Sequence, residues 1–237
     1  MRWRDAAVLL PLLLLLTACA APPESPPAPS PPAPPPAASV EPEPKPLPEP
    51  EPVPVPEPEA FVKVADYIPE ILVDLRYSGP ENFTGQAIYD FTDAWLRYGT
   101  VEKLAAAQEA LSAQGYGLLI WDAFRPVAAQ FRLWEVCPDP VYVANPEKGY
   151  SSHSRGNTVD VTLAALDGSG VEMPTGFDDF SALADRDYSD VPAEPRAHAQ
   201  LLEDVMTEAG FRPYQGEWWH FSDEDKYPVE EDFVPGS

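Results

Sequence analysis

The stretch SSHSRGNTVDVTL, residues 151–163, joins a polar turn to a β-forming run that contains an acid. In a strand that begins at Thr158, successive side chains alternate, so Val159, Val161 and Leu163 lie on one face and Asp160 lies on the other. A buried carboxylate is costly when it is alone and acceptable when it is paired or binds a cation. The stretch therefore indicates either a polar loop leading into an ordinary strand, or one half of a metal site whose other half lies elsewhere.

A candidate for that other half lies near the end of the chain. His153 is in the turn before Asp160, and GEWWH at 216–220 supplies His220. Two imidazoles and one carboxylate make a tetrahedral zinc set with the fourth position left for water, and Glu217 would then be the general base. Taken singly, a histidine in a polar loop and an E-x-x-H pair are weak signals, so ordinary surface and core residues are the alternative.

One geometric condition applies to Glu217. In a regular strand Glu217 and His220 point to opposite faces, so they converge only if Glu217 stands at an irregular start of the strand, near Gly216. The third histidine of the chain, His198, has no acidic partner at ligand spacing, and we expect it on the surface.

The pattern of apolar residues predicts a domain of mixed α and β structure. Helical spacing, β-branched runs and Gly or Pro punctuation set the expected boundaries. We expect helices at 101–115, 126–136 and 197–210, and strands at 117–124, 157–166 and 217–222. Thr92 or Asp93 would cap the first helix. Because strands and helices mix without a regular βαβ alternation or a G-x-G-x-x-G turn, an α+β fold is favoured over a doubly wound sheet.

Residues 1–18 have the organisation of a secretory signal peptide. Arg2 and Arg4 precede an apolar run at 6–16, which is shorter than the roughly 20 residues of a membrane-spanning helix. The following LTAC at 16–19 resembles the lipobox of bacterial lipoproteins, which implies lipidation of Cys19 as the first mature residue. An ordinary signal peptide with an incidental cysteine is the alternative.

Residues 19–60 are expected to form the lipidated cysteine and a disordered linker rich in Pro and Glu. Nineteen of the 32 prolines of the chain lie between Pro22 and Ala60, and this segment cannot bury a core. A polyproline II path of about 3.1 Å per residue would reach on the order of 100 Å. A tether is favoured over the alternative use, a proline-rich ligand for aromatic grooves. The folded domain is then expected at 61–237.

Charge and cysteine content narrow the partners. The formal net charge is −24, and residues 61–237 carry most of it. A domain this acidic repels phosphate backbones, which argues against nucleic-acid binding. The alternative is that the acidity only keeps the protein soluble. With Cys19 lipidated, Cys137 has no partner for an intrachain disulfide, and we expect it to be a small buried hydrophobe.

Six further stretches carry a resemblance to a known family. They are DLRY at 74–77, ENFTG at 81–85, WDAFRP at 121–126, SSHSRG at 151–156, MPTGFD at 173–178 and EWWH at 217–220. In this order they resemble the D-alanyl-D-alanine dipeptidase (VanX-type) family of zinc D-peptidases. The resemblance implies a zinc-peptidase domain of the D-Ala-D-Ala peptidase/hedgehog-like type, with a small central, mainly antiparallel sheet flanked by helices.

The same resemblance implies which residues carry the chemistry. His153, Asp160 and His220 would bind one Zn²⁺ per chain, and Glu217 would handle protons. Arg125 would stabilise the oxyanion that forms on the scissile carbonyl, whereas its alternative is a solvent-facing arginine ahead of a helix.

Three more residues are implied as substrate contacts. Asp178 would hold the free ammonium of the substrate with Ser151 assisting, and Tyr77 would help to shape the pocket. Because Asp179 follows directly, the sequence leaves open which of the two carboxylates points inward.

A free amino terminus needs an anion at a fixed distance from the metal, and a closed pocket excludes longer peptides. We therefore expect a dipeptidase that hydrolyses D-Ala-D-Ala. The alternatives are a D,D- or L,D-carboxypeptidase that trims peptidoglycan stem peptides on the same metal core, and a non-catalytic wall-binding lipoprotein. A serine hydrolase is disfavoured because no G-x-S-x-G elbow is present.

Export and lipidation set the expected location. The protein would reside in the bacterial cell envelope, on the periplasmic side of a membrane or at the cell surface, and would contact the membrane through its lipid only. Its partners there would be D-Ala-D-Ala or peptidoglycan-derived peptides, and a nutritional or recycling role is favoured over antibiotic resistance.

Overall fold

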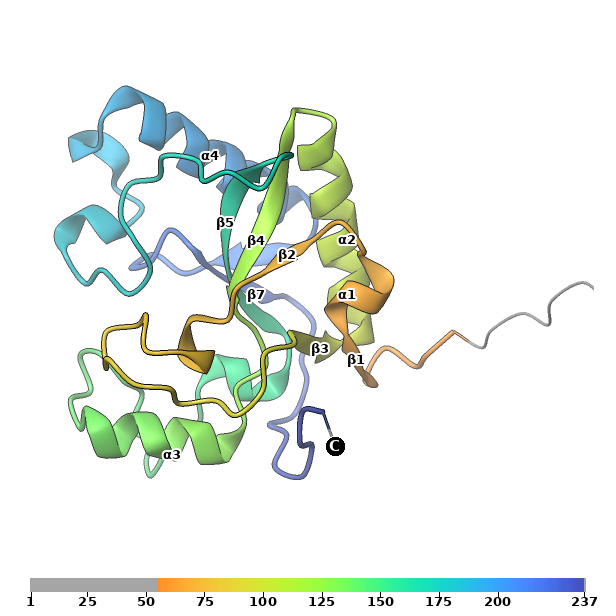
Figure 1. Cartoon of the computed structure of the whole chain (residues 1–237), viewed down its shortest axis with the longest axis vertical. Helices are drawn as coiled ribbons and strands as arrows, with labels where there is room; N and C mark the ends of the chain where they lie inside the picture. The colour runs from red at the N-terminus through yellow and green to blue at the C-terminus, as the bar shows by residue number, and fades with distance from the viewer. Residues whose placement is uncertain (1–54, 237) are drawn as a thin grey trace, which may run out of the picture. The chain divides into compact units, whose positions relative to one another are not determined.

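Two β-sheets organise residues 55–236, the part of the chain that the computed structural model describes (Figure 1). The strands are β1 (Phe61–Lys63), β2 (Leu72–Val73), β3 (Trp95–Arg97), β4 (Tyr116–Asp122), β5 (Thr158–Ala165), β6 (Phe211–Pro213) and β7 (His220–Asp223). Strands β1 and β3 form a two-stranded antiparallel sheet, and the other five form a sheet in the order β2-β4-β5-β7-β6. Only the β2–β4 pair of that sheet is parallel. An α+β fold with a small, mainly antiparallel sheet is therefore confirmed.

Four α-helices and four short 3₁₀ helices complete the described fold. They are α1 (Val64–Tyr67), α2 (Tyr98–Ser112), α3 (Val127–Val136), α4 (Ala193–Glu208), η1 (Arg76–Ser78), η2 (Ser152–Arg155), η3 (Ala182–Ala184) and η4 (Tyr188–Asp190). Helices α2 and α4 contact each other and pack on the five-stranded sheet, α2 against β4 and α4 against β5 and β6. Helix α3 lies apart from them, at the bottom of the view in Figure 1. No helix in residues 55–236 is long and apolar enough to cross a membrane.

Strand β5 packs one face into the hydrophobic core and presents the other face to the candidate site. Val159, Val161 and Leu163 belong to the hydrophobic core, together with Leu104 of α2 and Leu202 of α4. Each of the three β5 side chains is at most 1% exposed. Full burial of side chains of this kind contributes about 1.5–3 kcal/mol each, so this face fixes the register of the strand. The opposite face of β5 is thereby held toward the site described below.

Register places three polar residues side by side across the sheet. Asp160 of β5 lies opposite Asp122 of β4 on one side and opposite His220 of β7 on the other. The ladder between β4 and β5 shifts its register between Ile120 and Asp122. Irregularities of this kind bend a strand and re-aim its side chains, and here the irregularity ends β4 beside the site.

The last residues of the domain fold back onto its first strand. Phe233 stacks on Phe61 of β1, with ring centroids 4.3 Å apart and an interplanar angle of 5°. The Glu230 N–H donates to the Ser154 carbonyl of η2 at 2.8 Å, and the Glu230 carboxylate pairs with Arg97 at 3.2 Å. Figure 1 shows this C-terminal segment running beside β3 and β1. The turn that carries His153 is thus braced by the C-terminal segment, which is itself packed on the first strand.

Several expected boundaries were wrong. Helix α2 begins at Tyr98 with Arg97 as its N-cap and without a side-chain cap, so neither Thr92 nor Asp93 caps it. Strand β4 ends at Asp122 rather than at residue 124. Strand β7 begins at His220 rather than at Glu217, because a turn closed by the hydrogen bond from Glu217 N–H to the Tyr214 carbonyl precedes it.

Two other expectations differ from the structure in part. His198 was expected on the surface and is half-buried there: its Nδ1 lies 2.8 Å from the Glu172 carbonyl, and its Nε2 lies 3.4 Å from the Tyr116 hydroxyl. Cys137 is free and half-buried. The predicted signal peptide (1–18), the lipidated Cys19 and most of the predicted linker lie outside the described residues.

Candidate active site

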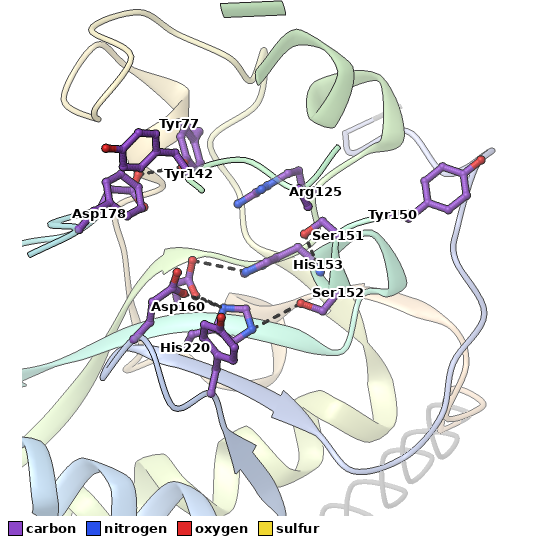
Figure 2. Close-up of a pocket in the computed structure, with 14 residues that line it drawn as sticks. Tyr77, Arg125, Tyr142, Tyr150, Ser151, Ser152, His153, Asp160, Asp178 and His220 are labelled. Atoms are coloured by element: carbon purple, nitrogen blue, oxygen red, sulfur yellow. Dashed lines mark hydrogen bonds and ion pairs between the residues drawn. The ribbon is translucent and has the colours of Figure 1, made fainter. Parts of the chain in front are cut away.

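Three side chains from two elements of the sheet and one turn form a candidate metal centre (Figure 2). His153 of η2, Asp160 of β5 and His220 of β7 each offer one ligand atom, and these atoms lie within 4.8 Å of one another. His153 Nε2 is 3.4 Å from Asp160 Oδ2, and His220 Nδ1 is 3.0 Å from Asp160 Oδ1. Ligands about 2.1 Å from a tetrahedral ion stand about 3.4 Å apart, so these separations suit one shared cation.

The outward-facing nitrogen of each histidine is held by the protein, which leaves the other nitrogen for a metal. His153 Nδ1 lies 2.8 Å from the carbonyl oxygen of Ala123, which can only accept, so Nδ1 carries the proton and Nε2 offers its lone pair. His220 Nε2 lies 3.4 Å from Ser152 Oγ, and its Nδ1 faces Asp160. Such outer contacts orient metal-binding imidazoles and select their tautomer.

The electrostatics of the carboxylate also suit a cation. Burial alone would raise the pKa of Asp160, but His153 and His220 outweigh burial and hold that pKa below its ordinary value. Asp160 is only 4% exposed, and its Oδ1 has no hydrogen-bond partner. An ionised, buried carboxylate oxygen without a hydrogen bond is costly, and a metal ion would satisfy it. The two imidazoles and the carboxylate therefore fit a zinc ion, which takes N and O ligands in this number.

Glu217 meets the geometric condition set by the sequence. It lies in the turn before β7, outside the regular strand, and its Oε2 is 3.5 Å from His220 Nδ1. Burial raises the pKa of Glu217 above its ordinary value. A carboxylate at the edge of the metal centre with a raised pKa is suited to accept a proton and return it.

Arg125 points into the same cavity and is held on three sides. Its Nη2 donates to Asp122 Oδ2 at 2.6 Å, its Nη1 to Gln130 Oε1 at 2.9 Å, and its Nε to the Tyr89 hydroxyl at 3.3 Å. Burial would lower the pKa of Arg125, but the Asp122 carboxylate outweighs burial and raises it. Because a guanidinium has five N–H donors, two remain for a substrate oxygen. Arg125 therefore faces the cavity, and the alternative of a solvent-facing arginine ahead of a helix is wrong.

Asp178 lies at the other end of the cavity and accepts a hydrogen bond from the Tyr77 hydroxyl at 2.8 Å. Burial raises the pKa of Asp178 to about 7, although the Tyr77 hydrogen bond lowers it. Its φ is +54°, the only positive value at a non-glycine residue of the described chain. Such a conformation is uncommon and is kept where the surroundings hold it. Asp179 is exposed and accepts from the Ser181 N–H, so Asp178 is the carboxylate that points inward.

The cavity between these groups has a volume of about 280 Å³. Ser151 lines it and accepts a hydrogen bond from the His153 N–H at 3.3 Å, so its own hydroxyl proton is free to reach a ligand. Figure 2 shows Asp178 and Tyr77 on one side of the metal centre and Ser151 on the other. The cavity therefore has two chemically different ends.

Two aromatic side chains lie at the rim of the cavity. Tyr142 and Phe180 line the cavity from two different loops, and their ring centroids are 4.8 Å apart. Phe180 also packs edge-on against Phe83 at 5.4 Å. Both rings are exposed, and Figure 2 shows Tyr142 near Asp178 and Tyr77.

The structure adds one residue that the sequence analysis assigned no role. Asp122 is fully buried and accepts from Arg125, from the Tyr89 hydroxyl at 2.6 Å and from the Ala123 N–H, and it lies 3.6 Å from His153 Nδ1. It is an acid that ends a mostly buried strand, and the argument used for Asp160 also applies to it. Asp122 therefore positions both Arg125 and the His153 imidazole.

Comparison with known proteins agrees with this geometry. Residues 57–235 match a protein family described as D-ala-D-ala dipeptidase. The chain is similar to the D-alanyl-D-alanine dipeptidase of Escherichia coli (strain K12), with 36% identity over 160 residues that cover 68% of this chain and 82% of the relative. It is also similar to the D-alanyl-D-alanine dipeptidase of Enterococcus faecium, with 34% identity over 65% of this chain and 87% of the relative. A solved structure of VanYB in complex with D-Alanine-D-Alanine aligns with a TM-score of 0.36 and 15% identity over 55% of this chain and 72% of that chain, a likeness too low to carry an argument.

Proposed function

The chain belongs to the peptidase family described as D-ala-D-ala dipeptidase, and from that premise we propose that it hydrolyses the free D-alanyl-D-alanine dipeptide with one zinc ion held by His153, Asp160 and His220. Zinc bound there would supply a Lewis acid that polarises the scissile carbonyl and lowers the pKa of water. Family membership makes the protein a metallopeptidase of the dipeptidase type. The choice of zinc, the substrate and the residue roles are the proposal.

Glu217 is the proton carrier of the proposed reaction. It accepts the proton of the attacking water at Oε2 and returns it to the amino group of the departing D-alanine. Its raised pKa supports this, because a carboxyl group whose pKa lies nearer to neutrality both accepts and donates a proton at working pH. Its position in the turn before β7 keeps it outside the metal-ligand set while it lies 3.5 Å from His220.

Arg125 stabilises the negative charge that develops on the scissile carbonyl oxygen. The salt bridge to Asp122 and the hydrogen bonds to Gln130 and Tyr89 fix the guanidinium before substrate arrives. A donor that needs no reorganisation is worth most in the transition state, and loss of a comparable oxyanion donor costs on the order of 10²–10³ in rate.

The carboxylate of Asp178 is the observation that carries the choice of a free dipeptide. An ammonium group placed there gains a charge-assisted hydrogen bond, and it would lower the cost of keeping Asp178 ionised in a buried position. Tyr77 keeps the carboxylate in place through its hydroxyl. With the amino end at Asp178, the C-terminal end of the substrate points toward Ser151 (Figure 2). An acylated amino end has no positive charge to offer Asp178.

The aromatic contact between Tyr142 and Phe180 supports the same choice. A stem peptide trimmed by a carboxypeptidase extends beyond the residue that Asp178 would bind, and it needs an open path there. The two rings, 4.8 Å apart, stand at the rim of the cavity and leave less room for such a peptide. The carboxypeptidase alternative therefore has to fit a longer peptide past these rings, whereas the dipeptidase does not.

A direct substrate comparison tests the proposal. The zinc-loaded full chain would be given D-Ala-D-Ala and N-acetyl-D-Ala-D-Ala, and the released D-alanine would be measured, with Glu217→Ala as the inactive control. We expect cleavage of the free dipeptide, little cleavage of the blocked one, and loss of both in the control. A preference for the blocked peptide would establish a wall carboxypeptidase, and zinc binding without cleavage of either would support a wall-binding protein.

We also propose that the protein acts outside the cytoplasm, anchored in the cell envelope through a lipid on Cys19, with residues 19–60 as its tether. The basis is the sequence of residues 1–60 alone: the apolar run, the LTAC stretch and the proline-rich segment. There it would meet wall-derived D-Ala-D-Ala and serve peptide turnover. Membrane association of the full chain that is lost in Cys19→Ala would support the anchor, and equal association of both would refute it.

A further inference from the structure

A second cavity of about 310 Å³ adjoins the active site on the side away from Asp178. Ser152 lines both cavities. The sheet also connects them: His220 lines the first cavity and Ser222, two residues along β7, lines the second, while Phe221 between them is buried on the opposite face. The two cavities therefore follow one another along one face of β7, beginning at the metal centre.

This second cavity gathers cations in an otherwise acidic domain. Of the twelve Lys and Arg residues in positions 55–236, six form ion pairs and six do not. Three of the six without an ion pair, Arg155, Arg212 and Lys226, line this cavity. Half of the uncommitted cations of the described chain thus gather beside the active site, and we call the space that they line the basic cavity.

The acids of the basic cavity cancel only part of this charge. Asp223 and Asp225 line it and share a single cation, Lys103, and Asp223 also accepts from the Thr100 hydroxyl. Glu224 lines the cavity without an ion pair. The three lining cations therefore face two negative charges, one on Glu224 and one left on the Asp223–Asp225 pair, and this local positive excess favours an anionic ligand.

A buried acceptor adds a second feature to the ligand. Asn157 lines the basic cavity and donates through Nδ2 to the carbonyl oxygens of Asp223 and Asp225. These two bonds fix the orientation of the amide, and its Oδ1 is buried without a hydrogen-bond partner. A buried acceptor of this kind calls for an N–H donor. A peptide fragment offers both a carboxylate and N–H groups.

Distances along the strand match a substrate that is longer than D-Ala-D-Ala on its C-terminal side. Two residues of a strand span roughly 7 Å, which separates Ser222 from His220. The carboxylate of a plain dipeptide lies about one residue repeat, roughly 3.6 Å, from the scissile carbonyl, whereas a second carboxylate beyond it lies at roughly twice that distance.

We propose that the basic cavity is a subsite for a second carboxylate on the leaving-group side, either the side chain of an acidic C-terminal residue or the terminus of one further residue. The inference rests on the proposed function, which sets the direction of the substrate in the cavity.

Binding to an inactive chain tests the subsite apart from catalysis. The zinc-loaded full chain with Glu217→Gln would be titrated calorimetrically with D-Ala-D-Glu and its neutral analogue D-Ala-D-Gln. The second pair of ligands would be D-Ala-D-Ala-D-Ala and the same tripeptide with an amidated terminus. We expect the acidic member of at least one pair to bind about tenfold more tightly at low salt, since exposed ion pairs contribute a few-fold each. The preference should shrink as salt screens the charges.

Matched variants separate the basic cavity from the general charge of the domain. Arg212→Gln with Lys226→Gln should abolish the charge preference, and Lys226→Gln alone should reduce it. Arg196→Gln removes an arginine of α4 that also lacks an ion pair, lies outside both cavities, and should leave the preference intact.

The outcomes distinguish the two proposals. A preference for D-Ala-D-Glu identifies a side-chain carboxylate as the ligand, and a preference for the free tripeptide identifies a further residue. Equal binding within both pairs, or a preference that survives the double substitution, overturns the subsite. Hydrolysis of D-Ala-D-Ala by the unsubstituted chain, measured in parallel, reports on the proposed function alone.

Discussion

The two ends of the active-site cavity are built in different ways. At the metal end, Asp160 and His220 stand opposite each other in the register of β5 and β7, and His153 is fixed through the Ala123 carbonyl at the end of β4. At the other end, Asp178 lies in a loop, with φ at +54° and the Tyr77 hydroxyl as its hydrogen-bond partner. Asp160 and His220 lie on the sheet itself and His153, Glu217 and Arg125 on turns directly beside its strands, whereas a longer loop holds the group that selects the substrate.

Because the two ends are built differently, we expect amino-acid substitutions at each end to affect different kinetic parameters. Groups on regular elements are held more precisely than groups on loops, and precise placement matters most where bonds are made and broken. We therefore expect substitutions at the metal end to lower kcat and substitutions at the Asp178 end to change KM and substrate choice.

The largest effect is expected for Glu217→Gln, which removes the proton acceptor and keeps the shape of the side chain. The kcat for D-Ala-D-Ala should fall about 10²–10⁴-fold with KM little changed, as for loss of a general acid–base group. Zinc content, measured by elemental analysis, should remain one per chain. A fall in zinc content would make Glu217 part of the metal-binding set instead.

Asp178→Asn should act mainly through KM. Removal of one partner of a buried charge pair costs about 2 kcal/mol or more, so kcat/KM for the free dipeptide should fall about 30-fold or more. Asp179→Asn is the matched control, because that side chain is exposed and accepts from the Ser181 N–H. Equal losses in the two variants would contradict the assignment of Asp178 to the substrate ammonium.

The pH dependence of binding should follow the titration of Asp178. Burial raises its pKa to about 7, with Asp160 and Asp122 also raising it, while Tyr77 and Arg125 lower it. Only the ionised form binds ammonium, so about half of the affinity is lost at pH 7 and most of it by pH 6. The amino group of the dipeptide loses its own proton near pH 8, so the Kd of the dipeptide for the Glu217→Gln chain should rise several-fold between pH 8 and pH 6.

The control for this pH effect is the double variant with Asp178→Asn. It should bind weakly with little change between pH 8 and pH 6. A pH profile that is the same with and without Asp178 would assign the dependence to another group.

The smallest effect is expected for Tyr142→Ala, which opens the aromatic contact with Phe180. Hydrolysis of N-acetyl-D-Ala-D-Ala should rise a few-fold while that of the free dipeptide changes little, because the substitution adds space without moving the reacting groups. Phe131→Ala, at an exposed phenylalanine of α3 that does not line the cavity, is the control for loss of an aromatic ring. No gain on the blocked peptide would show that Tyr142 is not the barrier.

The metal end could be expected from the sequence, because strand alternation sets the face of Asp160 and the family resemblance implies His153 and His220 as its partners. The alternation around Asp160 separates it from Val159 and Val161, and the structure places His153 and His220 within reach of it. The sequence also showed that Glu217 and His220 can converge only if Glu217 lies outside the regular strand. The hydrogen bond from Glu217 N–H to the Tyr214 carbonyl closes a turn there, which meets this condition.

Other features could not be read in this way, because their causes are distant in the chain. The partners of Asp122 come from residues 89, 125 and 153, and a single strand pattern does not contain them. Tyr142 and Phe180 lie in loops without periodicity and meet only in the folded chain. The start of α2 was misplaced because β3 occupies Trp95–Arg97, where the propensity of a short segment gave no signal.

The stack of Phe233 on Phe61 bears on the order in which the protein folds. This contact joins residues 172 positions apart, and the Arg97–Glu230 pair joins residues 133 apart, so both close very long loops. Long-range contacts of this kind form late in folding. The chain loses conformational entropy when it closes the loop, and the contact stabilises the structure only after the loop is closed. The His153 turn receives its brace from Glu230 only when nearly the whole domain has emerged from the ribosome. A nascent chain therefore lacks a finished metal centre for most of its synthesis, which delays capture of metal until the domain can close around it.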